Sequence, residues 1–408
     1  MRIIHAHKYF YMRAGAERFQ LDLMDAQERA GHAVAPFAMH YPKNLPSAWS
    51  DYFVSEVNTE GSVGYGVGAI RQLARALWSR EAYKKMSKMI DAFRPDIVHI
   101  HNVHTHLSPS ILKACARHNV PVVMSVHDYA LVSANYSLWD TRRDKSMDLD
   151  DLGMWAAAKT RFIKGSFAAT FVLEAITRFH KWTGAYDRRI DRYHVISDFI
   201  ADVLVSVGYD AKKMVMHHSF TQPIKEMRKG DDGYVAYIGR LERYKGVHTL
   251  IEAMKAFPEV ELRIAGTGSY EKELRALVGE GQKVKFLGFV SGDDLENLRS
   301  RSRVMVAPSI WHEVLGLVAI EAMSCGVPVI VGDHGGLREM VEDGVSGSVF
   351  RAGDADSLAH SLEPFIRDEG FAKSMGEAAY QRASQIVDPE LLSSQIMDIY
   401  ESVIDSRE

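Results

Sequence analysis

Residues 308–336 of this chain have the sequence PSIWHEVLGLVAIEAMSCGVPVIVGDHGG, and their pattern is the clearest indication of the fold. The apolar run before it, 302–307, ends at a proline and predicts a strand. Residues 317–325 repeat apolar side chains at helical spacing and stop at a glycine, so they predict a helix. Residues 326–330 are typical of a buried parallel strand. Strand, helix and strand in this order indicate a doubly wound α/β domain.

Two glutamates lie eight positions apart in this segment, Glu313 in the expected loop and Glu321 in the expected helix. The backbone N–H groups around Gly316 and Leu317 open that helix without intrahelical partners, so they predict a seat for phosphate oxygens. Carboxylates beside such a seat would repel phosphate, but they suit hydroxyl groups. The pattern therefore predicts a bound sugar nucleotide, and glycines 335–336 predict a close approach of the backbone to another group. The simpler alternative is that both glutamates face water.

The composition excludes several classes of protein. The 408 residues are 47% hydrophobic, enough for two sizeable cores, and a formal charge of −4 gives no reason to expect nucleic acid. The two cysteines, Cys115 and Cys325, are expected on helices of separate domains, so no disulfide is predicted and a reducing cytoplasm fits. We find no signal peptide and no run near the roughly 20 apolar residues of a spanning helix.

Apolar strands alternate with helical stretches along most of the chain, which is typical of parallel sheets with helices on both faces. The alternation lapses at 219–233, where a proline, glycines and mixed charges are typical of a linker. We therefore expect a Rossmann-like domain at 1–220 and a second one at 221–388, followed by an amphipathic terminal helix at 389–408. Ligands of such domains gather outside the carboxyl ends of the strands.

The segment at 308–336 resembles the signature of retaining glycosyltransferases of the GT-B fold, family four, whose EX7E motif is matched by Glu313 and Glu321. The resemblance continues over most of the chain. The stretches that carry it are YVAYIGRLERYKG at 234–246, LRIAGTG at 262–268, VKFLGFV at 284–290, AGAE at 14–17, GH at 31–32 and HD at 127–128. It implies two Rossmann-like domains that face a cleft. The first would bind the acceptor and the second the nucleotide sugar, with Leu392, Ile396 and Ile399 of the terminal helix on the first domain.

The resemblance also implies roles for the second domain. Glu321 would bind the ribose hydroxyls, Glu313 the hydroxyls of the donor sugar, and backbone atoms near Val290 the base. Arg240 and Lys245, together with the Gly316 and Leu317 amides, would bind the diphosphate: the planar guanidinium through paired donors and the ammonium as a point charge. Two cations neutralise a leaving group without a metal, so we expect no essential divalent ion and no cofactor.

In the first domain, Gly15 opens a helix after the first strand and lets a ligand approach the backbone. Ala14 stands where the family more often has a second glycine, and Glu17 is interpreted as a first-turn glutamate that stabilises its own helix. The resemblance implies that His127 contacts the donor sugar and stabilises positive charge at the anomeric carbon. Asp128 would orient His127 or cap the following turn.

Histidines cluster at 99–106, which raises a metal-site hypothesis, because imidazole is a common metal ligand. Carboxylates and cysteines at ligand spacing are missing nearby, so we predict no metal site. His101 and Asn102 are instead expected at a strand end, in contact with the acceptor. Residues 155–192 interleave basic and aromatic side chains with apolar ones. They predict either contact with a membrane surface or an ordinary amphipathic helix packed on the first domain.

The resemblance implies a retaining, metal-independent hexosyltransferase. It would move a sugar from a UDP- or GDP-sugar to a hydroxyl of a glycan or lipid-linked acceptor in cell-surface polysaccharide biosynthesis, in the cytoplasm or at the inner membrane face. The favoured mechanism lets the departing phosphate accept the acceptor's proton, so catalysis is mostly positioning and charge stabilisation. Three alternatives stay open: transfer to a small soluble acceptor, a non-hydrolysing sugar-nucleotide epimerase, and a non-catalytic nucleotide-sugar or glycan-binding protein.

Overall fold

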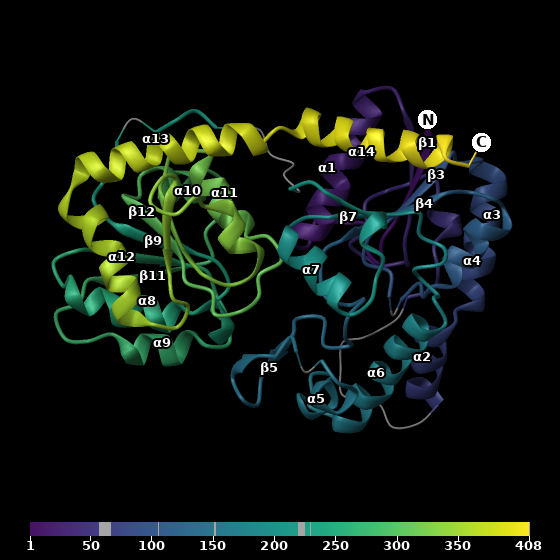
Figure 1. Ribbon diagram of the computed structural model, residues 1–408, viewed down its shortest axis with the longest axis horizontal. Helices are drawn as coiled ribbons and strands as arrows, with labels where there is room; N and C mark the ends of the chain where they lie inside the picture. The colour runs from purple at the N-terminus through teal and green to yellow at the C-terminus, as the bar shows by residue number, and fades with distance from the viewer. Residues whose placement is uncertain (57–66, 105, 151, 219–224, 229, 408) are drawn as a thin grey trace. The chain divides into compact units, whose positions relative to one another are not determined.

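Most strands of this chain form two separate six-stranded parallel sheets, each in its own structural unit (Figure 1). Our computed structural model describes residues 1–408 except 57–66, 105, 151, 219–224, 229 and 408. Unit 1 comprises Met1–Arg143, Met147–Thr221 and Pro389–Glu408, and unit 2 comprises Asp144–Ser146 and Gln222–Asp388. Part of the linker predicted at 219–233 therefore lies outside the described residues.

The sheet of unit 1 has the strand order β2-β1-β3-β4-β7-β8. Its strands are β1 (Arg2–Ala6), β2 (Ala33–Phe37), β3 (Ile97–Ile100), β4 (Val122–Val126), β7 (Arg192–Val195) and β8 (Met214–Met216). The strands β3 and β4 are buried along their whole length, as a central strand with helices on both faces must be. A separate two-stranded ribbon pairs β5 (Trp139–Asp140) with β6 (Lys145–Ser146).

The helices of unit 1 include the last helix of the chain. They are α1 (Gly15–Arg29), α2 (Val67–Leu77), α3 (Arg80–Phe93), α4 (Ser110–Arg117), α5 (Met154–Lys159), α6 (Phe167–Trp182), α7 (Asp198–Ser206) and α14 (Pro389–Asp405), with 3-10 turns η1 (Ser50–Tyr52) and η2 (Ala211–Lys213). Leu392, Ile396 and Ile399 of α14 pack into one core with Ile3 and Phe19. Figure 1 shows α14 in yellow beside α1.

The sheet of unit 2 has the strand order β11-β10-β9-β12-β13-β14. Its strands are β9 (Val235–Ile238), β10 (Leu262–Ala265), β11 (Val284–Gly288), β12 (Val304–Ala307), β13 (Val329–Gly332) and β14 (Gly347–Phe350). The strand β9 lies between β10, which follows it in the chain, and β12. The direction in which strands are added therefore reverses between β9 and β12.

The helices of unit 2 are α8 (Val247–Ala253), α9 (Glu271–Leu277), α10 (Gly292–Ser300), α11 (Leu317–Met323), α12 (Ala355–Arg367) and α13 (Glu369–Ile386), with 3-10 turns η3 (Arg243–Lys245), η4 (Met254–Ala256) and η5 (Gly335–Met340). The apolar faces of α8 and α12 join the sheet in one core with Val235, Ile264 and Ile330. Among the described residues, we find no helix that is both long and apolar enough to span a bilayer.

The predicted fold class, two doubly wound parallel-sheet domains, is confirmed. The decisive segment differs from its prediction only at element ends. The helix that begins at Leu317 ends at Met323 rather than at 325, and the following strand begins at Val329 rather than at 326. The reason is local, because Gly326 takes a left-handed φ of 76° that extended strand backbone cannot contain, and Pro328 has no N–H to donate to a ladder.

Gly246 generates a test of how tightly the loops of unit 2 fit together. Its φ is +70°, and a Cβ at this position would lie 1.8 Å from the Pro308 carbonyl oxygen. We expect Gly246→Ala to lower the free energy of unfolding by about 3 kcal/mol or more, since backbone strain and a backbone clash add. Urea denaturation followed by circular dichroism measures the change.

Gly344 is the matched control, because its φ is +75° but no atom lies within 4 Å of the added Cβ. Gly344→Ala should cost only the strain of a left-handed alanine, about 1 kcal/mol. Equal losses in both variants would contradict a close contact between the two loops.

Candidate functional site

The candidate site of unit 2 lies where the strand order reverses. The loops after β9 and β12 leave the carboxyl ends of neighbouring strands, which is where open α/β sheets bind ligands. These loops touch through their backbones: the Ile310 N–H donates to the Tyr244 carbonyl oxygen at 3.0 Å. Gly246 has no side chain at the point where it meets the Pro308 carbonyl, so the two loops can come this close. Their side chains are thereby held next to each other.

Lys245 and Glu313 are brought together across these loops. The Lys245 ammonium lies 2.5 Å from Glu313 Oε1, and the Ser309 hydroxyl donates to the same oxygen at 2.9 Å. Both side chains are mostly shielded from solvent, with 19% and 15% of their surfaces exposed. The second carboxylate oxygen, Oε2, makes no hydrogen bond with a described residue, so it can accept one from a ligand.

Two aromatic rings support the cations of this site. The Lys245 ammonium lies 5.2 Å from the Trp311 ring centre and 5.8 Å from that of Tyr244. The Arg240 guanidinium lies 5.6 Å from the same Tyr244 ring, so one tyrosine contacts both cations. Arg240 is exposed and makes no ion pair with any part of the chain that the structure describes. Its charge is therefore available to an anion.

The turn that carries Arg240 is fixed by a buried tyrosine. The Tyr237 hydroxyl donates to the Arg240 carbonyl oxygen at 2.8 Å. It also occupies the space beside Gly239, where a Cβ would lie 2.8 Å from the hydroxyl oxygen. Burial, and then the negative charge of Glu313, raise the pKa of Tyr237, so this hydroxyl keeps its proton and remains a donor.

Glycines 335–336 come close to the loop that carries Glu313, not to an open space. A Cβ on Gly335, whose φ is +64°, would lie 2.4 Å from the Glu313 carbonyl oxygen. The Gly336 N–H donates to that same oxygen at 2.8 Å. The predicted close approach is thus confirmed, and its partner is the protein backbone.

Glu321 lies in α11 and is held by an arginine that sequence analysis missed. Arg299 of α10 donates from Nη2 to Glu321 Oε2 at 2.8 Å and from Nη1 to Glu296 at 2.9 Å. The Arg299 side chain is only 4% exposed, whereas that of Glu321 is 19% exposed. The alternative of a glutamate that merely faces water is therefore wrong. Only the folded arrangement of α10 and α11 reveals this pair.

The remaining predicted contacts of unit 2 are Gly316, Leu317 and Val290. Gly316 has a φ of +92° and immediately precedes α11, so Leu317 is the first helical residue. A Cβ on Gly316 would lie 2.3 Å from Leu337 Cδ1, which explains the glycine by packing. Val290 lines an open hollow beside Phe289, whose side chain is 79% exposed.

Unit 1 holds the other predicted residues. His127 follows β4 and is half-buried, with Nε2 at 3.1 Å from His101 Nδ1. Burial lowers the pKa of His127 to about 3, so its imidazole is neutral near pH 7. Asp128 caps the following turn, since its carboxylate accepts from the Ala130 N–H at 2.9 Å, as one of its two predicted roles required. Gly15 is the first residue of α1.

The prediction that His101 and Asn102 contact the acceptor needs correction, whereas the position predicted for Glu17 agrees with the structure. His101 is fully buried, so the expectation that it meets an acceptor is wrong, and Asn102 is only 9% exposed. The reason is that α1 and α14 cover the sheet face on which His101 lies. Glu17 does lie in the first turn of α1, but it is buried, 3.8 Å from the His7 ring. It therefore also neighbours an imidazole that the sequence does not place near it.

Three buried imidazoles converge in unit 1, which the sequence did not predict. His5 of β1 joins His99 of the neighbouring strand β3 and His101, which directly follows that strand, with one nitrogen from each ring within 4.8 Å of the others. His5 and His99 are register partners on adjacent parallel strands, so their side chains lie on the same face. Sequence analysis considered only the local cluster at 99–106 and missed His5 because it is distant along the chain.

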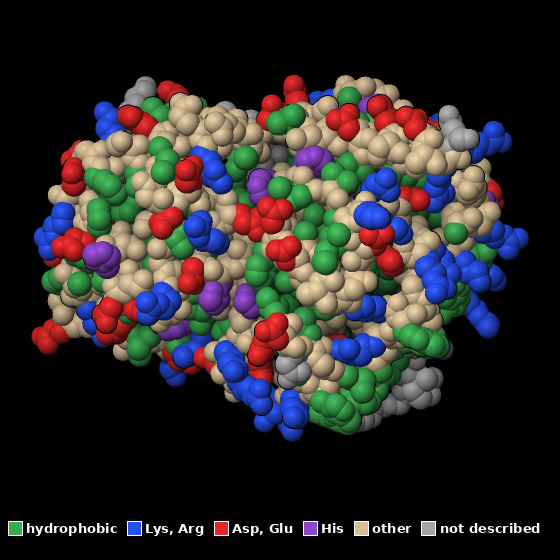
Figure 2. All heavy atoms as spheres, in the orientation of Figure 1, with side chains coloured by type: hydrophobic (Ala, Val, Ile, Leu, Met, Phe, Trp, Pro, Cys, Tyr) green, Lys and Arg blue, Asp and Glu red, His purple; other side chains and the backbone are tan. Residues whose placement is uncertain are grey.

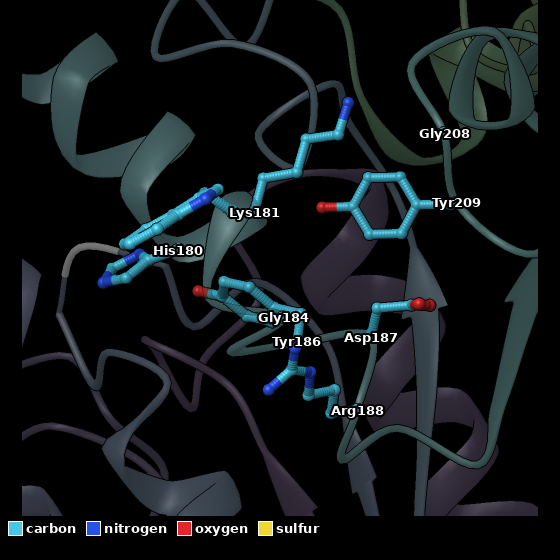
Figure 3. A pocket seen from close by; sticks show the side chains of 9 residues that line it. His180, Lys181, Gly184, Tyr186, Asp187, Arg188, Gly208 and Tyr209 are labelled. Atoms are coloured by element: carbon cyan, nitrogen blue, oxygen red, sulfur yellow. The ribbon is translucent and has the colours of Figure 1, made fainter.

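A pocket and an aromatic patch adjoin each other at the end of α6 in unit 1. The pocket is lined by Lys181, Tyr186, Asp187 and Tyr209, whose side chains surround it in Figure 3, and by Trp182. We define the α5–α6 patch by its exposed aromatic and basic side chains: Trp155, Lys159, Arg161, Lys164, Phe167, Phe179, Lys181 and Trp182. Figure 2 shows hydrophobic and basic side chains gathered in the region where Figure 1 places α5 and α6.

Comparisons with known proteins point to one family for the whole chain. Residues 13–220 match the profile described as Glycosyltransferase Family 4, and residues 219–382 match Glycosyl transferases group 1. The chain is 27% identical to the uncharacterized glycosyltransferase MJ1607 of Methanocaldococcus jannaschii, over 73% of each protein. It is 26% identical to a phosphatidyl-myo-inositol mannosyltransferase of Mycolicibacterium smegmatis, over 97% of this chain and 92% of that protein.

A solved structure of low sequence identity confirms the fold. The crystal structure of Anabaena HepE in complex with UDP superimposes with a TM-score of 0.69 over 98% of this chain and all of that one, at 19% identity. The two proteins therefore share the two-domain GT-B fold. At this level of identity the match carries no information on substrate.

The buried histidines predict that unit 1 loses stability in mild acid. Burial lowers the pKa of His5 to about 4 and that of His194 to about 3. A lowered folded-state pKa gives stability that is complete above pH 6.5 and is lost as the pH falls towards 4. We expect the free energy of unfolding to fall by about 1 kcal/mol per such histidine between pH 7.5 and pH 5.5. Urea titrations at the two pH values measure it.

The control compares the pH dependence of the free energy of unfolding in a variant, because other groups also titrate in this range. His194→Gln removes one of these imidazoles and should reduce the difference between the two pH values by about 1 kcal/mol, whatever its effect on absolute stability. An unchanged difference in this variant would show that the buried histidines do not cause the acid sensitivity.

Proposed function

Because the chain belongs to glycosyltransferase family 4, we propose that it transfers a hexosyl group from a nucleoside diphosphate sugar to a hydroxyl group, with retention of anomeric configuration. The observation that carries the proposal is the convergence of Arg240, Lys245 and Glu313 at the strand-order reversal of unit 2. Two cations and one carboxylate on adjoining loops suit a ligand that combines a diphosphate with a hydroxylated ring.

The diphosphate is proposed to bind at the two cations. The Arg240 guanidinium is exposed and lies over Tyr244, so paired N–H donors can meet phosphate oxygens without first leaving an acidic partner. Lys245 is already paired with Glu313, so an arriving phosphate competes for its ammonium or binds on its open side. The first amides of α11, at Gly316 and Leu317, are proposed to complete the phosphate site.

The two glutamates are proposed to bind sugar hydroxyls. Lys245 and Ser309 both bind Glu313 Oε1, which orients the carboxylate with Oε2 open to the transferred sugar. Arg299 holds Glu321 from a buried position, so this carboxylate reaches a ribose from a fixed direction. A carboxylate held in this way accepts hydrogen bonds from hydroxyl groups. The family resemblance supports the proposed contacts of His127 and Gly15 with the donor and of Val290 with the base.

The proposed reaction exchanges one bond at the anomeric carbon for another on the same face of the sugar. The bond to the diphosphate oxygen breaks, the acceptor oxygen bonds to the same carbon, and the acceptor's proton moves to the departing phosphate. Arg240 and Lys245 stabilise the negative charge that grows on that phosphate, while the adjoining loops hold the reactants together. Neutralisation by two protein cations needs no divalent ion, which is the basis for proposing metal independence.

Arg240→Ala tests the donor site directly. Losing a charge-assisted bidentate contact, worth about 1.5 to 3 kcal/mol, should weaken nucleoside diphosphate binding roughly 10- to 100-fold. A thermal-shift panel of UDP, GDP, ADP and their sugars first identifies the base, and calorimetry with the best ligand then compares the variant with the native protein. Arg240→Lys, which keeps the charge but not the planar donors, should lie between them.

Arg275→Ala is the matched control, because it removes an arginine of α9 in the same unit that pairs with Glu271 instead. It should bind the nucleotide as the native protein does. Native affinity in Arg240→Ala, or no association of the native protein with any of these ligands, would overturn the proposed donor site.

Product analysis with an assigned donor separates the alternatives. Slow release of free sugar excludes a binding protein, and conversion of the donor to an isomeric sugar nucleotide without an acceptor favours an epimerase.

The proposed acceptor is a glycan or lipid-linked molecule in cell-surface polysaccharide biosynthesis. Support comes from the full-length relative that acts, by its name, on phosphatidyl-myo-inositol. Transfer to a small soluble acceptor is the remaining alternative.

The α5–α6 patch supports a lipid-linked acceptor, and we propose that it contacts the headgroup layer of the inner membrane face. Trp182 is 80% exposed and Trp155 is 60% exposed, which is unusual for a side chain of this size. Exposed lysines and an arginine lie beside them, and this combination favours anionic lipid surfaces.

Replacing both tryptophans tests this contact. We expect Trp155→Ala with Trp182→Ala to weaken binding to vesicles that contain an anionic phospholipid by about tenfold or more, since two buried rings are lost. Co-sedimentation with vesicles measures the bound fraction. Phe289→Ala removes a comparably exposed ring from unit 2 and should not change it. Equal vesicle binding by all three proteins would exclude the patch as a membrane contact.

A further inference from the structure

A row of polar side chains crosses the core of unit 1, on the sheet face covered by α1 and α14. His5 lies on β1, His99 on β3, Ser125 on β4 and His194 on β7, and all four are completely buried. Parallel strands in a core are normally apolar, and a buried polar group without a partner is costly. The partners of these side chains therefore explain why the row is stable.

The hydrogen bonds of this row form one unbranched path. It starts at the His217 carbonyl oxygen, after β8, which lies 3.2 Å from His194 Nε2, and His194 Nδ1 lies 2.8 Å from Ser125 Oγ. Ser125 Oγ lies 2.8 Å from His99 Nε2, His99 Nδ1 lies 2.6 Å from Tyr400 OH, and Tyr400 OH lies 3.3 Å from Gln27 Nε2. Gln27 Oε1 lies 2.8 Å from His5 Nε2, His5 Nδ1 lies 3.1 Å from His101 Nε2, and His101 Nδ1 lies 3.1 Å from His127 Nε2. The path begins beside the edge strand β8 and ends at His127, at the carboxyl end of β4.

The carbonyl at one end sets the direction of the first bonds. A carbonyl oxygen only accepts, so His194 must donate from Nε2. A neutral imidazole carries one N–H, which leaves His194 Nδ1 as an acceptor for the Ser125 hydroxyl. The Ser125 oxygen then accepts from His99 Nε2. Burial lowers the pKa of His99 well below 6.5, and the neighbouring imidazoles lower it further, which keeps the ring neutral.

The same rule passes the direction on through α14. Because His99 donates from Nε2, its Nδ1 accepts the Tyr400 hydroxyl hydrogen, and the Tyr400 oxygen accepts from the Gln27 amide nitrogen. Gln27 then presents its oxygen to His5, which donates from Nε2. Tyr400, in the last helix of the chain, is therefore an obligatory link between the two halves of the path.

The last bonds fix the protonation of His127. His5 Nδ1 is an acceptor, so His101 donates from Nε2, and His127 in turn donates from Nε2 to His101 Nδ1. The opposite direction would require a lone pair on His194 Nε2 to face the lone pairs of the His217 carbonyl at 3.2 Å. That repulsive contact excludes the reversed path, together with the inverted amide of Gln27 that it would need.

We infer that this path is a tautomer relay: the His217 carbonyl holds His127 as the imidazole with its proton on Nε2 and a lone pair on Nδ1. His127 Nδ1 makes no hydrogen bond within the described part of the chain, so it presents an acceptor. It suits a hydroxyl hydrogen and not a phosphate oxygen. That use of the acceptor rests on the proposed function, whereas the direction of the relay does not. The other members of the path are positioning residues.

A metal ion at the convergence of His5, His99 and His101 is the competing interpretation. All six ring nitrogens of these residues take part in the path. A metal ion would need one lone pair from each ring at a single point and would break the bonds on which the direction depends. The relay and a metal at this place exclude each other.

Couplings across hydrogen bonds in nuclear magnetic resonance spectra test the direction. In deuterated protein with ¹⁵N-histidine, recorded without ligand, we expect a coupling from the protonated His127 Nε2 to His101 Nδ1 and from the protonated His101 Nε2 to His5 Nδ1. His127→Gln assigns the first signal by its loss. Donors at His101 Nδ1 and His5 Nδ1 would overturn the relay. Absence of the two expected couplings from a sample that contains stoichiometric zinc would also overturn it, because a metal ion at the three histidines excludes the relay.

Two variants interrupt the path several hydrogen bonds before His127. Ser125→Ala separates His99 from the anchoring carbonyl, and Tyr400→Phe separates Gln27 from His99, so in each a second set of signals with the reversed donors should appear at a tenth of the total or more. Tyr209→Phe is the matched control, since its buried hydroxyl donates to the Leu131 carbonyl outside the path, and it should show one set of signals. One unchanged set in both path variants would overturn the inference. Arg240→Ala, which tests the donor site, should leave the couplings as they are, so failure of the proposed function is distinguishable.

Discussion

The backbone contact between the loops after β9 and β12 is the constraint on which the site of unit 2 depends. Gly246 meets the Pro308 carbonyl where no side chain could fit, and Ile310 donates to Tyr244 beside it. These contacts are made by backbone atoms, so they hold the loops whatever the side chains do. Lys245 and Glu313 consequently lie within bonding distance although 68 positions separate them. The geometry is prepared before any ligand arrives, which is how a protein lowers the entropic cost of binding.

The charged side chains of this site differ in whether they have a partner of opposite charge. Lys245 is paired with Glu313, and Glu321 is paired with Arg299, whereas Arg240 rests on an aromatic ring without an acidic partner among the described residues. The paired charges supply direction, because each carboxylate has one oxygen fixed by a cation. The guanidinium supplies attraction, because its charge is not already compensated. A ligand with both hydroxyls and a diphosphate would use each kind of group.

Unit 1 contains a row of polar side chains in its core. The imidazoles on the path to His127 carry no charge, since burial keeps them neutral, and along this path each donor meets an acceptor. A satisfied network of this kind specifies one arrangement of the core, because any alternative leaves a buried group unpaired. Tyr400 makes the last helix part of that arrangement in addition to its apolar packing.

Sequence patterns were enough to predict the main strands and helices of this protein and the kinds of residue at its sites. Apolar periodicity, glycines and prolines predicted the parallel strands and the terminal helix, and the spacing of Glu313 and Glu321 predicted a loop and a helix at a strand end. These features are local, so a short window contains their cause. Tertiary structure alone decided that Arg299 holds Glu321, that His5 joins His99 and His101, and that a carbonyl at His217 orders the path to His127. Those contacts depend on which strands are neighbours and on where helices cross the sheet, and no local pattern encodes either.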